Sequence, residues 1–444
     1  MNSKDDKQRT TPIRGYLEGY YGKLLSWSER GDLLQFLNSQ RMSTYCYAPK
    51  EDTQHRLHWR EEHNSQWHTN FAQFCTLATN LNVCIVAGIA PGLDFNFDQN
   101  ARFNDFDCLH AKANSFLKDG AHEILIMWDD IDDDHFIDRD GFSEGTAHAR
   151  VINRLSDKIG CPLWTVPRVY AAEIENKNNY LEDFFAELNP QHTVLLCGTA
   201  IVARNISTSD LVKLSHFPAN VESTANDTNN LNIEDKKAKT DKTDKTDKTD
   251  KTGKAGKADK ADKADKAGKA GKAGKTLKHR TVVWDNFYAN DYCPRRLFLG
   301  PWTGREQIND YLLNPTGLPY TDKLLLDIAA TTHTSTDIQN DWENALKRHG
   351  VPDSFLAIAP YFTEPFFGDR KITGNIQDMD YIVPTDEIEH AIEECLWKWK
   401  TPLAREWYPY IFGLKHDIAL SKGVLPRDRV LKTQTTLLAK RLLQ

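Results

Sequence analysis

The run ILIMWDDIDDD at residues 124–134 joins an apolar segment to a cluster of acids, and Asp129 and Asp130 stand where the two parts meet. Successive residues of a strand point to opposite sides, so the two carboxyl groups are expected in different environments, which would separate their pKa values. One carboxylate can then stay ionised while its neighbour keeps a proton and acts as a general acid. The pair therefore predicts acid–base chemistry at the end of a buried strand.

The acids behind this pair have a simpler interpretation. Asp133 and Asp134 are expected in a helix cap or a solvated loop. A calcium loop is an alternative, because the D-x-D-x-D spacing is met from Asp130 onwards. However, its sixth position is His135 where glycine is required, and its twelfth is Gly141 where glutamate is required. We therefore expect no metal here.

Other short apolar runs also lead into hydrogen-bonding groups, or into a glycine that leaves room for a ligand. The residues in question are Gly19, Lys50, Tyr170, Asn286, Asp291 and Asn314. If they meet at one place, they form a polar site suited to a hydroxyl-rich ligand.

Eight β-rich runs alternate with amphipathic helical patterns, which indicates a parallel sheet with crossover helices. The predicted strands span 13–18, 42–47, 83–89, 123–128, 162–166, 193–198, 280–284 and 310–313. Eight such units predict an α/β fold, a closed (β/α)8 barrel of the TIM type. The loops after the carboxyl ends of the strands carry the chemistry in these barrels, so the polar residues above are expected at one face.

The domain organisation follows from shifts in composition. We expect a disordered N-terminus over 1–12, the barrel over 13–335 and a C-terminal helical region over 336–444. Residues 221–278 are largely a three-residue repeat of Lys with Thr, Asp, Ala and Gly, which cannot fill a core. This segment is expected to be a disordered insertion between the sixth and seventh strands. The C-terminal helices are candidates for packing against a second subunit in a homo-oligomer.

Charge and hydropathy exclude several classes of protein. The formal net charge is -7, and the Lys-rich repeat holds much of the positive charge, so the folded remainder is acidic and no nucleic-acid partner is expected. No apolar run approaches the ~20 residues that span a bilayer, so no membrane partner is expected either. The first fifteen residues contain no apolar leader, and the eight cysteines include no CxxC pair. We expect free thiols, no cofactor and a cytoplasmic protein.

With these residues in view, the sequence resembles glycoside hydrolase family 84, the family of the protein O-GlcNAc hydrolases and related bacterial β-N-acetylglucosaminidases. The stretches that match are LEGYYG, STYCYAPKEDTQHRLHWRE, IAPGLDFNF, MWDDIDDD, VVWDNFYANDYCPRRLFLGPWTGR and LLNPTG. They occur in order from Gly15 to about Gly317 and cover the predicted barrel. The Lys-rich insertion is not part of the family pattern.

The resemblance implies a glycosidase that removes terminal β-linked N-acetylglucosamine from a glycoconjugate. It implies a retaining, substrate-assisted mechanism in which the 2-acetamido oxygen of the sugar attacks the anomeric carbon and forms an oxazoline. Asp129 would orient and polarise the acetamide, and Asp130 would protonate the leaving oxygen and then activate water. Tyr170 would bind near the acetamide. The sugar would be held by Gly19, Lys50, Asn286, Asp291 and Asn314, between apolar walls supplied by Trp284, Tyr292 and Tyr20.

Two alternatives share this fold. One is an endo-acting, hyaluronidase-like hexosaminidase, and the other is a barrel that binds N-acetylglucosamine without cleaving it. Retention of both Asp129 and Asp130 favours an enzyme over a binding protein.

Two further alternatives rest on short motifs. GFSEG at 141–145 matches the G-x-S-x-G elbow of serine hydrolases, but it does not follow a buried strand, and Ser143 is expected to cap a helix that begins near Glu144. A zinc site is suggested by His55, His58, His63 and His68, but no HExxH or paired Cys accompanies them, so they are interpreted as polar loop residues.

Overall fold

The structure is a computed structural model of the chain, and it describes residues 11–98, 104–132, 141–215, 279–293, 295–333, 335–363, 385–422 and 424. Several predictions fall outside these residues. They concern the N-terminus up to residue 10, Asp133 and Asp134 with most of the calcium-loop pattern, the Lys-rich insertion, and residues 425–444 of the predicted C-terminal helical region.

Eight parallel strands form a closed barrel in chain order, with the last strand paired to the first. The strands are β1 (Arg14–Glu18), β2 (Thr44–Tyr47), β3 (Cys84–Ile89), β4 (Glu123–Met127), β5 (Trp164–Val166), β6 (Thr193–Leu196), β7 (Arg280–Asp285) and β8 (Tyr311–Leu313). Each lies in or next to a predicted strand, and the (β/α)8 fold class is confirmed.

The strands read as continuous apolar runs because both of their faces are buried. In β4, Leu125 and Met127 belong to an apolar cluster that fills the barrel, whereas Ile124 and Ile126 belong to the larger cluster between the strands and the helices. All four side chains are fully buried. The inner cluster closes the barrel interior, so a ligand can be accommodated only at the strand ends.

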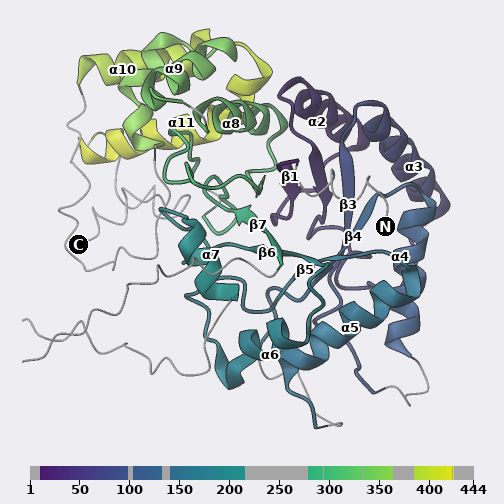
Figure 1. Cartoon of the computed structure of the whole chain (residues 1–444). Coiled ribbons are helices and arrows are strands. Elements are labelled where there is room, and N and C mark those ends of the chain that lie inside the picture. The colour runs from purple at the N-terminus through teal and green to yellow at the C-terminus, as the bar shows by residue number, and fades with distance from the viewer. Residues whose placement is uncertain are drawn as a thin grey trace, which may run out of the picture. The chain divides into compact units, whose positions relative to one another are not determined.

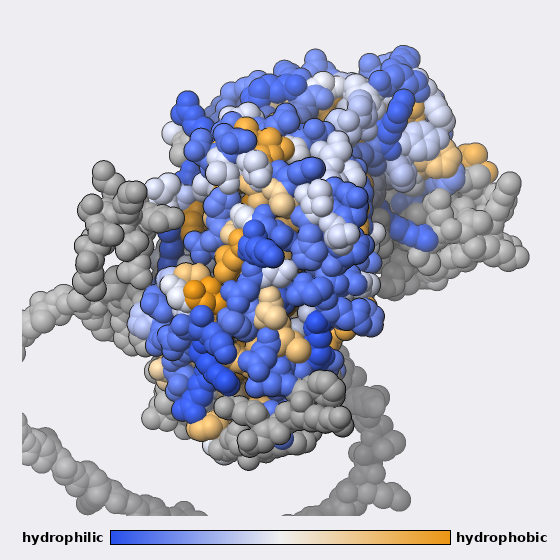
Figure 2. Space-filling view, turned by 90° about the vertical axis from the view of Figure 1, so that its right-hand side faces the viewer, coloured by the Kyte–Doolittle hydropathy of each residue, from blue (hydrophilic) through white to orange (hydrophobic). Residues whose placement is uncertain are grey.

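Crossover helices cover the outside of the barrel, and Figure 1 shows α2 to α6 arranged around the strands. The helices up to the last barrel unit are α2 (Trp27–Ser39), α3 (Ser65–Asn80), α4 (Asp105–Lys118), α5 (Glu144–Ile159), α6 (Tyr180–Glu187), α7 (Thr208–Ser215) and α8 (Pro319–Thr332). The face in Figure 2 is mostly hydrophilic, with small separate apolar groups. Among the helices that the structure describes, none combines the length and the apolar character needed to cross a membrane.

A helical region follows the barrel. It contains α9 (Ile338–Arg348), the 3-10 turns η2 (Asp353–Ala357) and η3 (Ala359–Tyr361), α10 (Asp386–Glu393), the π-helical turn η5 (Glu394–Lys398) and α11 (Pro402–Ser421). Glu406 of α11 accepts hydrogen bonds from the backbone N–H groups of Tyr320 and Thr321 at the start of α8, at 3.1 and 2.7 Å. Trp407 donates its indole N–H to the hydroxyl of Thr321. A buried polar contact thus fixes α11 to the last barrel helix.

The end of β1 carries a buried ion pair whose loss should destabilise the barrel. Arg30 of α2 donates two hydrogen bonds to the Glu18 carboxylate, at 2.9 and 2.7 Å, and both residues are at least 98% buried. Arg30→Met would leave this carboxylate with the Tyr45 hydroxyl as its remaining donor in the described structure. We expect a loss of about 3–5 kcal/mol in the free energy of unfolding, measured in urea at neutral pH.

The matched control is the double variant Glu18→Gln, Arg30→Met, which removes both charges. Because no unpaired charge is then buried, the double variant should be more stable than Arg30→Met alone. An Arg30→Met protein within about 1 kcal/mol of wild type would contradict this account of the ion pair.

Candidate active site

A cavity of about 510 Å³ lies among the loops that follow the carboxyl ends of the strands, the place where barrel chemistry is built. Every predicted site residue except Lys50 and Tyr20 lines it, and Lys50 reaches the acid pair from beside it. The lining consists of Gly19, Tyr21, Asp129, Asp130, Tyr170, Glu173, Ile201, Val202, Trp284, Asn286, Ala289, Asp291, Tyr292 and Asn314. The chain thus brings side chains from six strand-end loops to one cavity.

Asp129 and Lys50 form a buried ion pair at this cavity. The Lys50 ammonium lies 2.5 Å from Oδ2 of Asp129, and the two side chains are 0% and 4% exposed. The other carboxylate oxygen, Oδ1, is buried and has no hydrogen-bond partner among the described residues. A buried acceptor without a donor is costly, so this oxygen is suited to an N–H or O–H group of a ligand.

Asp130 is held by two phenols. Tyr170 donates its hydroxyl to Oδ1 and Tyr21 donates its hydroxyl to Oδ2, each at 2.8 Å. Lys50 lies farther from this carboxylate, at 3.7 Å, and the Asp130 side chain is 33% exposed. The two aspartates therefore do have different environments.

The reason for this difference is not the alternation of strand residues that the sequence suggested. Strand β4 ends at Met127, before either acid, and Asp130 has a φ of 55°, in the left-handed region. Its side chain therefore enters the same cavity as that of Asp129. The prediction that the two carboxyl groups point to opposite sides was wrong, because the alternation of a strand does not continue past Met127.

The protonation state of Asp130 also differs from the prediction. Burial raises the pKa of this carboxyl group, but the Lys50 ammonium and the O–H donors of Tyr170 and Tyr21 outweigh that effect, and the pKa lies below its ordinary value. The group is thus a carboxylate at neutral pH in the unliganded protein. A bound ligand that displaces a phenol from Asp130 would raise the pKa again.

Two asparagines and a glycine tie three strand-end loops together. Asn314 donates to Oδ1 of Asn286 at 2.8 Å, and its own Oδ1 accepts the backbone N–H of Gly19 at 3.1 Å. The indole of Trp284 also donates to Oδ1 of Asn286. A Cβ on Gly19 would lie 2.8 Å from a ring carbon of Trp284, so the glycine allows this indole to form a wall of the cavity.

Asp291 also lines the cavity and positions a residue that the sequence analysis missed. Its Oδ2 accepts the backbone N–H of Tyr21 at 3.0 Å, and its Oδ1 accepts that of Tyr292 at 2.9 Å. Tyr20 was predicted as an apolar wall but is 1% exposed, with its hydroxyl 2.8 Å from that of Tyr16 in the core. Tyr21 lines the cavity instead, and nothing in the adjacent pair of tyrosines indicates which one faces it.

The residues of the two motif-based alternatives, the serine elbow and the histidine cluster, have other roles in the structure. Ser143 is the N-cap of α5 and accepts the backbone N–H of Thr146, as expected. The histidines do not converge on one point: His55 contacts the carbonyl of Gly88, His63 contacts Asp52 and His68 contacts Asp119. Neither motif supplies a catalytic group to the cavity.

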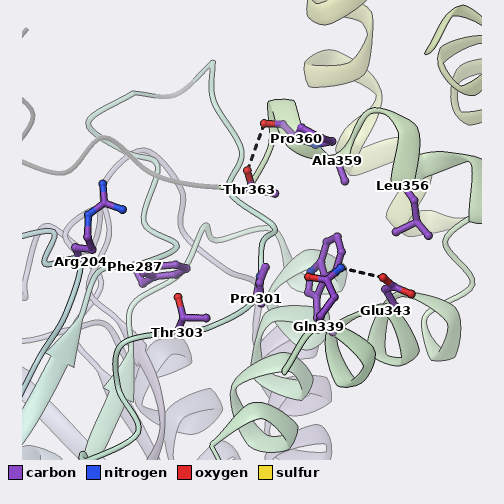
Figure 3. A pocket seen from close by; sticks show the side chains of 11 residues that line it. Arg204, Phe287, Pro301, Thr303, Gln339, Glu343, Leu356, Ala359, Pro360 and Thr363 are labelled. Carbon is purple, nitrogen blue, oxygen red and sulfur yellow. Dashed lines mark hydrogen bonds between the residues drawn. The ribbon is translucent and has the colours of Figure 1, made fainter. Parts of the chain in front are cut away.

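A second cavity, also of about 510 Å³, lies between the barrel loops and the C-terminal helices. Figure 3 shows Arg204 and Phe287 on its barrel side and Gln339 and Glu343 on the opposite side, on α9. Among the described residues that line this second cavity, Glu343 alone carries a carboxylate. The second cavity therefore lacks the paired acids of the first one.

A closed barrel with an acid pair and a lysine at the strand ends defines a barrel protein equipped for acid–base chemistry on a polar ligand. The chain belongs to the beta-N-acetylglucosaminidase family, whose model matches residues 14–243 and 255–359. The resemblance inferred from the sequence motifs is thereby confirmed.

Individual relatives are distant. Protein O-GlcNAcase from Rattus norvegicus and that from Mus musculus are each 24% identical over 315 residues, which are 68% of this chain. The chain spans 28% of the length of these curated relatives.

Two solved structures share the fold. A Thermobaculum terrenum O-GlcNAc hydrolase mutant has a TM-score of 0.67 at 18% identity, over 97% of this chain and 87% of that one. CpGH84B has a TM-score of 0.59 at 20% identity, over 97% of this chain and 65% of that one.

Proposed function

We propose that this protein hydrolyses terminal β-linked N-acetylglucosamine from glycoconjugates by a retaining, substrate-assisted mechanism. The observation that carries the proposal is the acid pair. Asp129 has a buried acceptor oxygen without a donor in the described part of the chain, and the neighbouring Asp130 accepts hydrogen bonds from two phenols. Family membership supports the class of reaction.

In the first step, Oδ1 of Asp129 accepts the N–H of the 2-acetamido group and turns its carbonyl oxygen toward the anomeric carbon. That oxygen forms a bond to the carbon while the bond to the leaving oxygen breaks, and Asp130 gives its proton to the leaving oxygen. The buried Asp129 carboxylate, paired with Lys50, stabilises the positive charge that develops on the acetamide.

In the second step, the Asp130 carboxylate removes a proton from water, and the water oxygen attacks the anomeric carbon. The bond to the acetamide oxygen breaks, so the acetamide is restored and the sugar is released with its original configuration. No side chain forms a covalent bond to the sugar.

Other lining residues of the cavity support recognition of the sugar hydroxyls. Asp291 is a carboxylate acceptor there, and Asn286 and Asn314 fix the loops around it. Trp284 and Tyr292 supply apolar walls, and Tyr170 lies beside Asp130, near the proposed reacting centre. A cavity of about 510 Å³ is within the range of small-ligand sites.

The test compares a chromogenic aryl β-N-acetylglucosaminide with its N-trifluoroacetyl analogue, whose acetamide oxygen is a weaker nucleophile. We expect turnover of the first by wild type and a rate lower by orders of magnitude on the second. Asp129→Asn should lose activity on both, because the amide cannot stabilise the acetamide charge.

Wild type that binds the sugar without turnover would instead identify a binding protein. Equal rates on the two aryl substrates would contradict substrate assistance. Rates on oligosaccharides of increasing length distinguish removal of a terminal sugar from endo-acting cleavage.

We also propose that the protein acts in the cytoplasm. All eight cysteines are free in the structure, and four of them are buried. Unpaired thiols are typical of a reducing compartment and support this location.

A further inference from the structure

We infer that Arg56 is a positioning residue for Asp130: its guanidinium holds the backbone of Asp130 in the left-handed conformation and so fixes where the carboxyl group lies. This inference rests on the proposed function, in which Asp130 is the proton donor. Arg56 does not line the cavity, and its hydrogen bond to the backbone of Asp130 is its direct contact with the acid pair among the described residues.

The conformation of Asp130 requires support. A φ of 55° is unfavourable for a residue with a side chain, although aspartate tolerates it better than most, and such residues occur where neighbouring groups hold them. Arg56 supplies this support, because its Nη2 donates a hydrogen bond of 2.7 Å to the backbone carbonyl of Asp130. A guanidinium donor makes this bond stronger than one between neutral groups.

Arg56 itself is held rigidly against the barrel. Its neighbour His55 is fully buried, with Nδ1 2.9 Å from the carbonyl oxygen of Gly88 in β3. The backbone carbonyl of His55 accepts the N–H of Ala90 at 3.0 Å. Because β3 pairs with β4, these two contacts fix Arg56 relative to the strand that leads into Asp130.

The burial of Arg56 is otherwise difficult to explain. The residue is 8% exposed, and no carboxylate lies within 4.0 Å of its guanidinium in the described part of the chain. Its Nη1 is buried and has no hydrogen-bond partner there. A buried cation with an incomplete set of acceptors costs stability, so the burial of Arg56 requires an explanation other than stability.

The bond to the Asp130 carbonyl determines the direction of the Asp130 side chain. In the observed conformation the carboxyl group meets the hydroxyls of Tyr21 and Tyr170. Without the Arg56 bond, φ of Asp130 can relax toward negative values, and the carboxyl group then leaves the place from which it reaches the leaving oxygen. A proton donor misplaced by about 1 Å loses much of its effect.

Leaving-group dependence tests this inference. The substrates are aryl β-N-acetylglucosaminides whose phenol leaving groups range from strongly to weakly acidic. The less acidic the phenol, the more its departure depends on a proton donor. For Arg56→Gln, we expect kcat/KM on the weakest leaving group to fall about 10- to 100-fold more than on the best one. Arg56→Lys should behave similarly, because an ammonium group retains the charge but not the planar guanidinium fork.

The matched control is Arg60→Gln. Arg60 is on the same loop but pairs with Asp94 and Asp105 and has no described contact with Asp130. Its loss should leave the leaving-group dependence at the wild-type value. Because the comparison uses a ratio of rates from one protein sample, a smaller folded fraction of Arg56→Gln does not affect it.

An equal fall on all leaving groups in Arg56→Gln, or a change as large in Arg60→Gln, would overturn the positioning role. Wild type inactive on the whole series would overturn the proposed function itself. The two failures are therefore distinguishable.

Discussion

Asp130→Asn is expected to lower kcat/KM by about 10²- to 10⁴-fold on a substrate with a weakly acidic leaving group. The amide oxygen of the new side chain can still accept a hydrogen bond from one phenol, and its NH2 group can donate to the oxygen of the other, so the local structure should persist. The amide cannot give a proton to the leaving oxygen. On a substrate with a strongly acidic phenol the loss should be much smaller. Steady-state rates on the two substrates measure the difference.

The pH dependence of the same variant supplies a second test. A general acid loses its proton as pH rises, so kcat/KM should fall through the pKa of Asp130, which is lowered in the free protein. If the bound substrate takes the place of a phenol at Asp130, the pKa of Asp130 rises in the complex, and the fall in kcat should then occur at higher pH than the fall in kcat/KM. Asp130→Asn should abolish both falls.

Asp132→Asn is the matched control, because Asp132 belongs to the same acidic run but is exposed. It should retain wild-type rates and the wild-type pH profile. A loss in Asp132→Asn as large as that in Asp130→Asn would show that the acidic run acts through its total charge and not through one proton donor.

Lys50→Met is expected to have the second-largest effect. The Asp129 carboxylate, 4% exposed, would lose the ammonium group 2.5 Å away and become a buried charge without a cation. We expect a loss of about 3–5 kcal/mol in the free energy of unfolding, and kcat/KM lower by 10²-fold or more, on the order of one oxyanion-hole donor. Urea unfolding and rates on an aryl β-N-acetylglucosaminide measure the two effects.

Lys50 also affects the neighbouring acid. It is the largest influence that lowers the pKa of Asp130, so in Lys50→Met this pKa should rise and the fall in kcat/KM should move to higher pH. Lys23→Met is the control, because Lys23 is 35% exposed and lies 3.8 Å from Glu29. Its stability should change by no more than about 0.5 kcal/mol. If the two variants were indistinguishable, the buried pair would have no functional importance.

The barrel was predictable because its signals are local. A strand of a closed parallel barrel buries both faces, so its sequence is a short apolar run. A strand of the structure lies in or next to each of the eight predicted runs. The positions of Asp129, Asn286 and Asn314 followed from the same reasoning, since each comes directly after or close to the end of a strand. The structure places all three at one cavity.

The electrostatics of the site were not predictable, because they depend on groups far apart in the chain. Asp130 is bound by Tyr21, 109 residues away, and by Tyr170, 40 residues away, and these donors help to lower its pKa where the sequence suggested a retained proton. The choice of Tyr21 over Tyr20 likewise depends on the core, where Tyr20 contacts the hydroxyl of Tyr16.

The sequence by itself determined the (β/α)8 fold, the family and the set of strand-end residues, because burial periodicity and motif order are properties of short segments. Only the tertiary structure decided the direction of Asp130, its charge and the support given by Arg56. One backbone angle and the contacts of Asp130 with Arg56, Tyr21, Tyr170 and Lys50 control these features. The residue pattern around Asp130 encodes none of them.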